Sequence, residues 1–406
     1  MEHYVLYLAI VILGYCLFAG KMSEWAITMP MVFLLFGILV GLQGVILNHE
    51  TAEQFHLLAE LTLSMLLFAD ATQLRRDALE KIGERTARML LLGLPIAILF
   101  GSLLNVMLLP DWPLWEACLL AALLAPTDAA LGQAIQSNQK IPIAFRNAMN
   151  AESGLNDGLA LPFVIFFAGL AIERTPEAAA EGTLLHLLAT QIGLGVLAGI
   201  AVGCAVGIAR NFSIKHRLMD EGLARVGMLA AVGVTYFAAE HIGGNSFVAV
   251  FISGIAFANT AKGSVHQARE FIEGDGQFLA MLSFFFIGAL FVPEALNHAT
   301  WVGLAVVCLS LVLVRPVAIW ISLMGTNTAP NERLFYGWFG PRGLATALFA
   351  VFVAMDFEGL TRINDIIVIS MMAVVVSAFV HGISAKWAPQ IFRLGSSAEP
   401  NHQDRP

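Results

Sequence analysis

The stretch AESGLNDG, residues 151–158, places two carboxylates and an amide directly before a strongly apolar run. A carboxylate at membrane depth is costly and therefore faces a bundle interior or a water-filled cavity, usually for function. In a helix, Ser153 and Asp157 lie four residues apart on one face. Glu152 and Asn156 have the same spacing on another face. The stretch predicts a small-cation site inside a bundle of membrane-spanning helices.

The overall composition is that of a membrane protein. Of the 406 residues, 58% are hydrophobic and 13% charged, and the mean hydropathy is +0.76. These values exclude a soluble globular domain and a disordered chain. The net charge of −8 argues against a nucleic-acid partner, and the cysteines and histidines lack metal-ligand spacing, so we expect no cofactor. No cleavable signal precedes the first apolar run, so we expect that helix to be retained.

Thirteen apolar stretches are long enough to cross a hydrocarbon core of roughly 30 Å. They predict an all-α polytopic fold with about 13 transmembrane helices and no soluble domain, within a single unit over residues 1–395. The predicted spans lie near 4–19, 27–46, 54–72, 88–109, 114–136, 147–171, 184–209, 223–241, 245–259, 271–292, 300–324, 333–355 and 363–388.

Basic residues in the loops indicate the orientation of the chain. With the N-terminus outside, 18 of the 22 Lys and Arg residues fall in cytoplasmic segments and two in outer segments. The remaining two, Arg315 and Arg342, lie within spans. Because cytoplasmic loops are enriched in Lys and Arg, we expect an outside N-terminus and a cytoplasmic C-terminus with a short tail at 396–406. We expect the plasma membrane as the location.

Two spans are interrupted in the same way. The fifth contains LLAPTDAALG, residues 123–132, and the twelfth contains GWFGPRGLAT, residues 337–346. In each, a proline removes a backbone donor at mid-membrane and a charged residue follows closely. The two spans run in opposite directions, which is typical of an inverted-repeat transporter with its site at the midplane. Ordinary proline kinks are the alternative interpretation.

The ionisable residues at membrane depth define the possible chemistry; they are Asp70, Asp128, Glu152, Asp157, Arg315 and Arg342. Because a guanidinium is always charged, we expect Arg342 to form a structural ion pair with Glu152. Asp157 then remains beside the neutral oxygen donors of Ser153 and Asn156. Burial favours the neutral form of an unpaired carboxylate, so Asp157 could hold a proton or a cation, but not both together.

This competition predicts an antiporter rather than an enzyme. Oxygen-only ligands, including backbone carbonyls freed near Thr127, suit Na⁺ or Li⁺. Since the amide of Asn156 does not titrate, we expect one proton per cation. Simpler roles remain open: Asp128 could only cap a helix, Ser153 could bond its own i−4 carbonyl, and Asp157 could pair with Arg315. His241 and His381 are expected at the membrane interface.

The three motifs ESGLNDG, APTDAAL and FGPRGLA, in this order on spans six, five and twelve, resemble those of the monovalent cation:proton antiporter-1 family, the NhaP-type and NHE-type sodium/proton exchangers. The resemblance implies that Asp157 carries the ion and the proton, with Asn156 as its neighbour. It also implies that Ser153 and the break at Thr127 and Asp128 line the site. Asp70 is offset by one residue, about 100° of helix rotation, from the glutamate of many members, so its reach to the cation is open.

The resemblance further implies a homodimer in which a core moves like an elevator against a dimerisation domain. The core would comprise helices near 88–171 and 300–388, and the dimerisation domain helices near 4–72 and 223–292, joined by a linker helix at 184–209. The partners would be Na⁺, H⁺ and membrane lipid.

Rival functions remain. Potassium/proton exchange is the main one, because oxygen ligands alone do not set the cavity size. An intramembrane aspartyl protease would use Asp128 and Asp157 as a dyad, but Arg342 and the inverted repeat argue against it. A cation channel would need no titrating residue.

Overall fold

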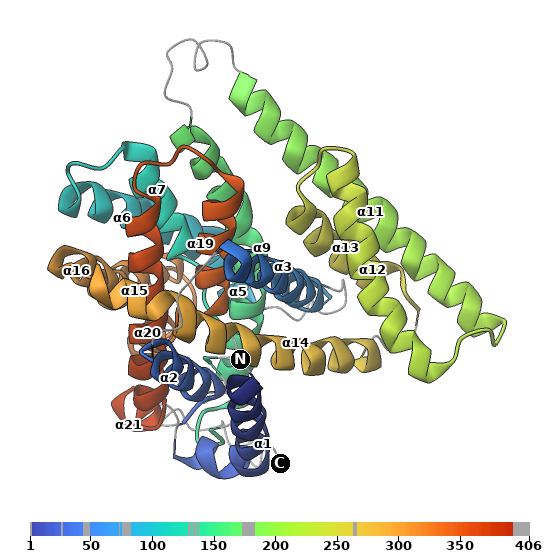
Figure 1. Cartoon of the computed structure of the whole chain (residues 1–406), viewed down its shortest axis with the longest axis horizontal. Coiled ribbons are helices and arrows are strands. Elements are labelled where there is room, and N and C mark those ends of the chain that lie inside the picture. The colour runs from blue at the N-terminus through green and yellow to red at the C-terminus, as the bar shows by residue number, and fades with distance from the viewer. Residues whose placement is uncertain are drawn as a thin grey trace, which may run out of the picture.

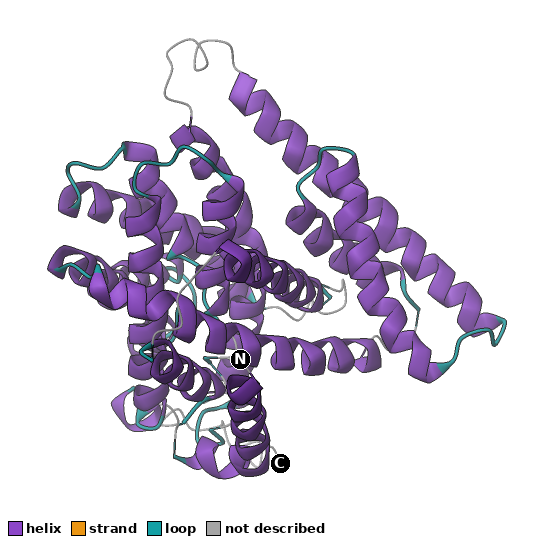
Figure 2. Cartoon of the chain, viewed as in Figure 1, coloured by secondary structure: helices purple, strands orange, loops and turns teal. Residues whose placement is uncertain are grey.

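The computed structural model describes residues 2–25, 27–43, 49–72, 74, 83–128, 131–132, 135, 138–172, 183–262 and 266–392. All regular elements in these ranges are helices, as Figure 2 shows. The predicted all-α class is therefore confirmed. The predicted tail at 396–406 and the loop residues Arg75, Arg76, Lys81 and Arg174 lie outside the described part.

The first half of the chain contains one long helix per predicted span, except where a helix is interrupted. Its elements are α1 (Glu2–Glu24), α2 (Met29–Gly41), α3 (His49–Ala71), α5 (Glu84–Arg88), the π-helix η1 (Met89–Gly93), α6 (Leu94–Leu108), α7 (Leu114–Leu123), α9 (Ile143–Ile172) and α11 (Thr183–Lys215).

The second half adds shorter pieces, because several of its spans are divided. Its elements are α12 (Glu221–His241), α13 (Ser246–Thr260), α14 (His266–Phe286), η2 (Ile287–Phe291), α15 (Val292–Asn297), α16 (Trp301–Leu309), η3 (Ser310–Val314), α17 (Arg315–Ser322), α18 (Pro330–Trp338), α19 (Leu344–Asp356), α20 (Ile363–Ala385) and α21 (Ala388–Ile391).

Six helices in the described ranges are long and apolar enough to cross a membrane, by length and composition. Five shorter apolar helices, among them α7, α13 and α19, accompany them. The other two expected spans fall on α3 and α12. The chain is a multi-pass membrane protein, and the total of thirteen spans stays a prediction.

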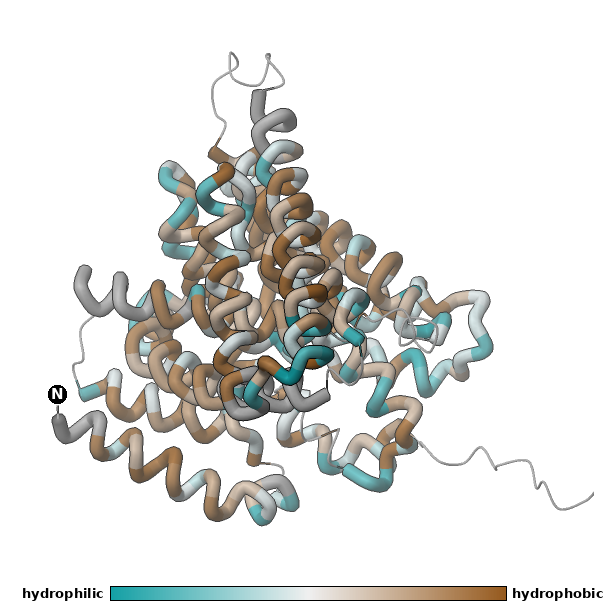
Figure 3. The backbone as a smooth tube through the Cα atoms, turned by 90° about the vertical axis from the view of Figure 1, so that its right-hand side faces the viewer, coloured by the Kyte–Doolittle hydropathy of each residue, from teal (hydrophilic) through white to brown (hydrophobic). Residues whose placement is uncertain are grey.

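Apolar side chains cover much of the outer surface, as expected for helices surrounded by lipid. Met107 is 79% exposed and Trp301 is 87% exposed, and hydrophobic residues follow the helices over most of their length in Figure 3. In water such a surface would drive aggregation. The surface therefore fits a protein whose solvent is hydrocarbon.

Three prolines explain the three π-helices. Pro95, Pro293 and Pro316 each lie at the second position after a π-helix, in α6, α15 and α17. A proline ring clashes with the carbonyl four residues earlier, and a wider turn before it relieves this clash. Two of these spans, the fourth with η1 and the eleventh with η3, are seven apart, and α17 packs against η1 and α6. The same defect thus recurs at corresponding places of the two halves.

Both predicted interruptions are confirmed. After α7, residues 124–128 leave the helical conformation, and residues 339–343 separate α18 from α19. The long helix α9 packs against α7, α3, α19 and α13, so it lies between the broken helices and the group formed by α11, α12 and α13, at the right of Figure 1. The division into core, linker and dimerisation regions stays a prediction.

Candidate functional site

The two interrupted segments touch through their backbones. The amide N–H of Asp128 donates to the carbonyl O of Pro341 over 2.8 Å. Both prolines identified in the sequence therefore lie where the two interrupted segments cross, with Asp128 on one segment and Arg342 on the other. The charged residues that follow the prolines are brought together, as the paired motifs predicted.

Asp128 caps a helix across this crossing. Its Oδ2 accepts from the backbone N–H of Leu344, the first residue of α19, and its Oδ1 accepts from the N–H of Leu131 over 3.4 Å. A carboxylate at a helix N-terminus is stabilised by the unsatisfied N–H groups there. A Cβ at Gly343 would lie 2.0 Å from Oδ2, so only glycine admits the carboxylate. Asp128 therefore caps α19, in the opposite broken helix. That it also caps the second half of its own span stays a prediction.

Arg342 satisfies carbonyl groups rather than a carboxylate. Its Nη1 donates to the O of Gly340 over 2.9 Å and to the O of Pro126 over 3.5 Å. These carbonyls follow the C-terminal ends of α18 and α7, where a positive charge is favourable. The predicted ion pair between Arg342 and Glu152 is therefore wrong: Glu152 acts on Arg342 electrostatically, without a hydrogen bond.

The partner of Glu152 is Arg315, the first residue of α17. Its Nη1 and Nη2 donate to Oε1 and Oε2 of Glu152 over 3.1 and 2.9 Å, and both side chains are buried. Gly340 makes room for this pair, since a Cβ there would lie 1.6 Å from Nε of Arg315. The sequence identified Arg315 as an intramembrane charge, but could not show which arginine the break of the twelfth span admits.

Three neutral polar side chains form a network beside this pair. The Oδ1 of Asn156 accepts from the backbone N–H of Thr127 over 3.1 Å, and its Nδ2 donates to the hydroxyl of Thr127 and to Oε1 of Glu152. The hydroxyls of Thr127 and Ser153 are 3.1 Å apart. Asn156 thus joins α9 to the first broken helix, and the bond of Ser153 is with Thr127 rather than only with its own helix.

Asp157 lies apart from this network. Its side chain is partly exposed, whereas Asp128, Glu152 and Asn156 are buried. Its Oδ1 is nevertheless buried and has no hydrogen-bond partner. The next residue, Gly158, packs against Phe251 of α13.

Three other carboxylates act on Asp157. Asp70 on α3, Asp128 and Glu152 all interact with it electrostatically. Asp70 is partly buried, and it reaches the vicinity of Asp157 from a different helix from the other two. The structure therefore brings the predicted residues into one region, divided between a hydrogen-bonded network and the less enclosed Asp157.

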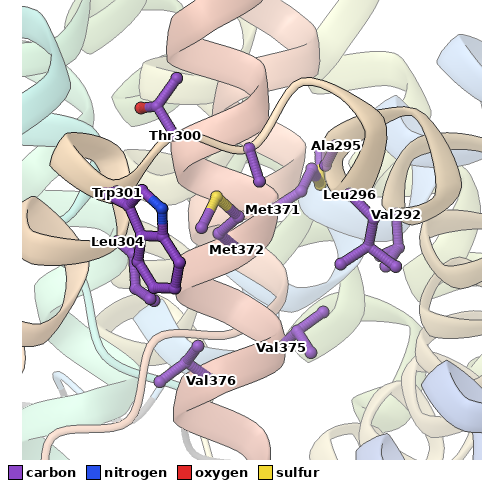
Figure 4. A pocket seen from close by; sticks show the side chains of 11 residues that line it. Val292, Ala295, Leu296, Thr300, Trp301, Leu304, Met371, Met372, Val375 and Val376 are labelled. Atoms are coloured by element: carbon purple, nitrogen blue, oxygen red, sulfur yellow. The ribbon is translucent and has the colours of Figure 1, made fainter.

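One apolar cavity can be distinguished from this region. It has a volume of about 330 Å³ and lies among α15, α16 and α20 (Figure 4). Trp301, Met371 and Val376 are among its lining residues, and no charged side chain lines it. A monovalent cation needs oxygen ligands, so this cavity does not serve as a cation site.

Sequence reasoning missed one polar residue at the crossing. Ser377 of α20 accepts the backbone N–H of Arg342 through its Oγ over 2.6 Å, and it is fully buried. His381, one turn further on, is 2% exposed, so it is buried among the helices, and its expected place at the level of the membrane interface stays a prediction. The only signal was their four-residue spacing on an apolar helix.

Comparison with known proteins gives a consistent picture. The family model described as "Sodium/hydrogen exchanger, transmembrane" matches residues 8–389. The K(+)/H(+) antiporter NhaP2 of Shewanella sp. (strain MR-4) is 23% identical over 383 residues, 93% of this chain and 65% of that protein. The probable Na(+)/H(+) antiporter C3A11.09 of Schizosaccharomyces pombe is 27% identical over 313 residues, 73% of this chain and 41% of that protein.

A solved structure shares the fold. The sodium proton antiporter MjNhaP1 from Methanocaldococcus jannaschii, at pH 8, matches with a TM-score of 0.75 and 23% identity, over 97% of this chain and 100% of that chain. The chain spans about two thirds or less of the curated relatives it matches, 65% for the Shewanella protein.

Proposed function

Because this chain belongs to the sodium/hydrogen exchanger family, we propose that it exchanges a monovalent cation for a proton across the plasma membrane. Asp157 is the carrying residue. Asp157 holds Na⁺ or Li⁺ when the site is open to one side of the membrane, and it holds a proton when the site is open to the other side. The family match and the buried ion network favour transport over catalysis.

One observation carries this assignment. Of the carboxylates on α9 and the first broken helix, Glu152 is held by Arg315 and Asp128 by the N–H groups of Leu344 and Leu131. Asp157 is the one with a buried oxygen that lacks a hydrogen-bond partner. A buried acceptor of this kind needs a proton or a cation. Its electrostatic interactions with three other carboxylates also attract a cation.

The neighbours have different roles in this proposal. Ser153 and Thr127 offer hydroxyl oxygens to the cation from the network side, at the cost of their mutual hydrogen bond. Asn156 acts as a fixed link, because both ends of its amide are already bonded. Asp70 contributes negative charge from α3. The buried pair of Glu152 with Arg315 keeps the crossing rigid, and the charge of Arg342, held at its carbonyls, balances that of Asp128.

The exchange is electroneutral in this scheme. Asp157 accepts one proton or one monovalent cation, and the amide of Asn156 adds no second titrating group. The protein works as a homodimer with an elevator-like movement of the core. Sodium or lithium suits an all-oxygen site; potassium is the second candidate, because the Shewanella relative is named a K(+)/H(+) antiporter.

Proton movement in proteoliposomes tests the proposal. Vesicles with an imposed pH gradient and a pH-sensitive dye receive Na⁺, Li⁺ or K⁺, with native protein, Asp157→Asn and the matched control Asp111→Asn, which changes an exposed loop aspartate. Native protein and the control should dissipate the gradient, and Asp157→Asn should not. Dissipation of the gradient by Asp157→Asn would contradict the assignment of Asp157 as the carrying residue. Dissipation by native protein with K⁺ alone would identify K⁺ as the substrate in place of Na⁺ or Li⁺.

Electroneutrality has its own test. Valinomycin with K⁺ clamps the membrane potential, and one-for-one exchange driven by Na⁺ should proceed at the same rate at different clamped potentials. A rate that follows the potential would contradict the stoichiometry, while a current without a pH gradient would favour a channel.

A further inference from the structure

The interruption between α18 and α19 removes a specific hydrogen bond. In a continuous helix, the N–H of Arg342 would donate to the carbonyl O of Trp338, four residues earlier. Here α18 ends at Trp338 and residues 339–343 are not helical. At membrane depth an unsatisfied backbone group costs several kcal/mol. The carbonyl of Trp338 accepts from the N–H of Gly340 over 2.9 Å, so the N–H of Arg342 is the group that needs another partner.

Two side chains of α20 occupy the position of the missing bond. Ser377 Oγ accepts the N–H of Arg342 over 2.6 Å, and His381 Nε2 lies 2.9 Å from the O of Trp338. The two side chains are joined to each other, because Nδ1 of His381 lies 3.0 Å from Ser377 Oγ. All of these contacts lie in the protein interior: Ser377 is 0% and His381 2% exposed.

Both ring nitrogens of His381 face a carbonyl, because Nδ1 also lies 3.1 Å from the backbone O of Ser377. The hydrogen of a neutral ring is assigned to Nε2, since Trp338 offers Nε2 only an acceptor, whereas Nδ1 can accept from the hydroxyl of Ser377. Nδ1 then accepts from the hydroxyl of Ser377, whose oxygen accepts in turn from Arg342. A continuous chain of hydrogen bonds therefore runs from the amide of Arg342 to the carbonyl of Trp338.

We propose that Ser377 and His381 replace the missing helical hydrogen bond and thereby fix the width of the break, acting as positioning residues for the ion site. Their four-residue spacing on α20 matches the four-residue spacing of the two groups that they join. A second contact holds the same end of α18: Nε1 of Trp338 donates to Oγ of Ser384 over 3.1 Å.

The width of the break determines the geometry of the crossing. The residues after Phe339 contact the charged groups of the crossing. Gly340 lies against Arg315, the carbonyl of Pro341 accepts from the N–H of Asp128, and the N–H of Leu344 donates to the carboxylate of Asp128. A shift at the break therefore moves the groups that balance the charges around Asp157. The consequence for transport rests on the proposed function.

Three variants and one control test this inference. Ser377→Ala and His381→Leu break the chain, whereas His381→Gln keeps a donor for Trp338 and an acceptor for Ser377. Ser370→Ala is the matched control, because Ser370 lies on the same helix, is fully buried, and its Oγ has no hydrogen-bond partner. Ser377→Ala removes a single oxygen and carries the test if His381→Leu does not purify as folded protein.

Hydrogen exchange in detergent, measured by mass spectrometry on the peptide covering 338–344, reports on the hydrogen bond of the Arg342 N–H independently of transport. Ser377→Ala and His381→Leu should accelerate exchange there by about tenfold, as expected for one lost buried hydrogen bond, and His381→Gln and Ser370→Ala should not. In proteoliposomes, the first two variants should raise the KM for the cation by about five- to tenfold with kcat within about twofold, and His381→Gln should restore the native KM.

An unchanged rate of hydrogen exchange in Ser377→Ala would contradict the proposal that these side chains replace the helical hydrogen bond. Faster hydrogen exchange with an unchanged KM for the cation would contradict the positioning role. If exchange accelerates as expected while the native protein moves no cation, the hydrogen-bond chain is supported and the proposed function fails instead.

Discussion

Glu152 on α9 and Arg315 on α17 are joined by two parallel hydrogen bonds of 3.1 and 2.9 Å, although 163 positions separate them in the sequence. Both side chains are almost completely enclosed, at 3% and 4% exposure. A buried pair of this kind holds its two helices in one arrangement, and loss of one partner leaves the other charge without compensation.

Removal of Arg315 should therefore destabilise the protein strongly. Arg315→Ala should cost about 3–5 kcal/mol, seen as a lower melting temperature in detergent, and the double variant with Glu152→Gln should recover part of it. The surface pair of Arg362 with Asp365, 3.7 Å apart and half exposed, gives the control: Arg362→Ala should cost at most about 1 kcal/mol. Additive effects of Arg315→Ala and Glu152→Gln would contradict the coupling.

Substitution of Gly343 should disrupt the crossing. Gly343→Ala places a Cβ 2.0 Å from Oδ2 of Asp128, so the carboxylate must leave the N-terminus of α19. We expect loss of most cation-driven proton movement, with a melting temperature lowered by the equivalent of about 1–3 kcal/mol. Gly14→Ala is the control, since nothing lies within 4 Å of a Cβ there. Normal transport by Gly343→Ala would show that Asp128 need not cap α19.

Replacement of Asn156 by aspartate should be worse than truncation. Nδ2 of Asn156 donates to Oε1 of Glu152 over 3.2 Å and to the hydroxyl of Thr127, and an aspartate would present a carboxylate oxygen there. We expect Asn156→Asp to destabilise by about 2 kcal/mol or more, and Asn156→Ala by less. Thermal unfolding of both variants in the same detergent measures the order, and the reverse order would contradict the linking role of Asn156.

Substitution of Glu116, which is not part of the ion site, should also destabilise the protein. This buried side chain at the start of α7 accepts from the N–H of Thr361 (3.0 Å), from its hydroxyl (2.6 Å) and from the N–H of Arg362 (2.6 Å). Glu116→Ala leaves these donors unsatisfied and should cost about 2–3 kcal/mol. Glu294→Ala, at a side chain 67% exposed, should be nearly neutral in the same melting experiment. Equal melting temperatures for the two variants would remove the role of Glu116.

Much of the fold could be read from the sequence, because the signals were local. Apolar length predicted the helices, and a proline followed by a charge predicted both breaks, at Pro126 and Pro341. The capping role of Asp128 was also accessible, since a short acidic residue after a break suits a helix N-terminus. That it caps the opposite helix depends on the crossing, which no local pattern describes.

The choice of arginine could not be predicted in the same way. Arg315 and Arg342 both lie in spans, and the pairing with Glu152 depends on the register of α17 after η3 and on the space left by Gly340. Similarly, Ser377 and His381 appear in the sequence as isolated polar residues in an apolar helix. Their partners are backbone groups of α18 and of the break that follows it, which sequence patterns do not assign to side chains.

The pairing of charges at the crossing has a consequence for leakage. Glu152 and Asp128 contribute two negative charges there, and Arg315 and Arg342 contribute two positive charges, so the total is zero. In the proposed cycle Asp157 alone changes charge: loaded with a proton or a cation the moving unit is neutral, and empty it bears one negative charge. Moving a net charge through hydrocarbon is far costlier than moving a neutral unit. An unloaded carrier is thus held back, and neither ion can run down its gradient without the other.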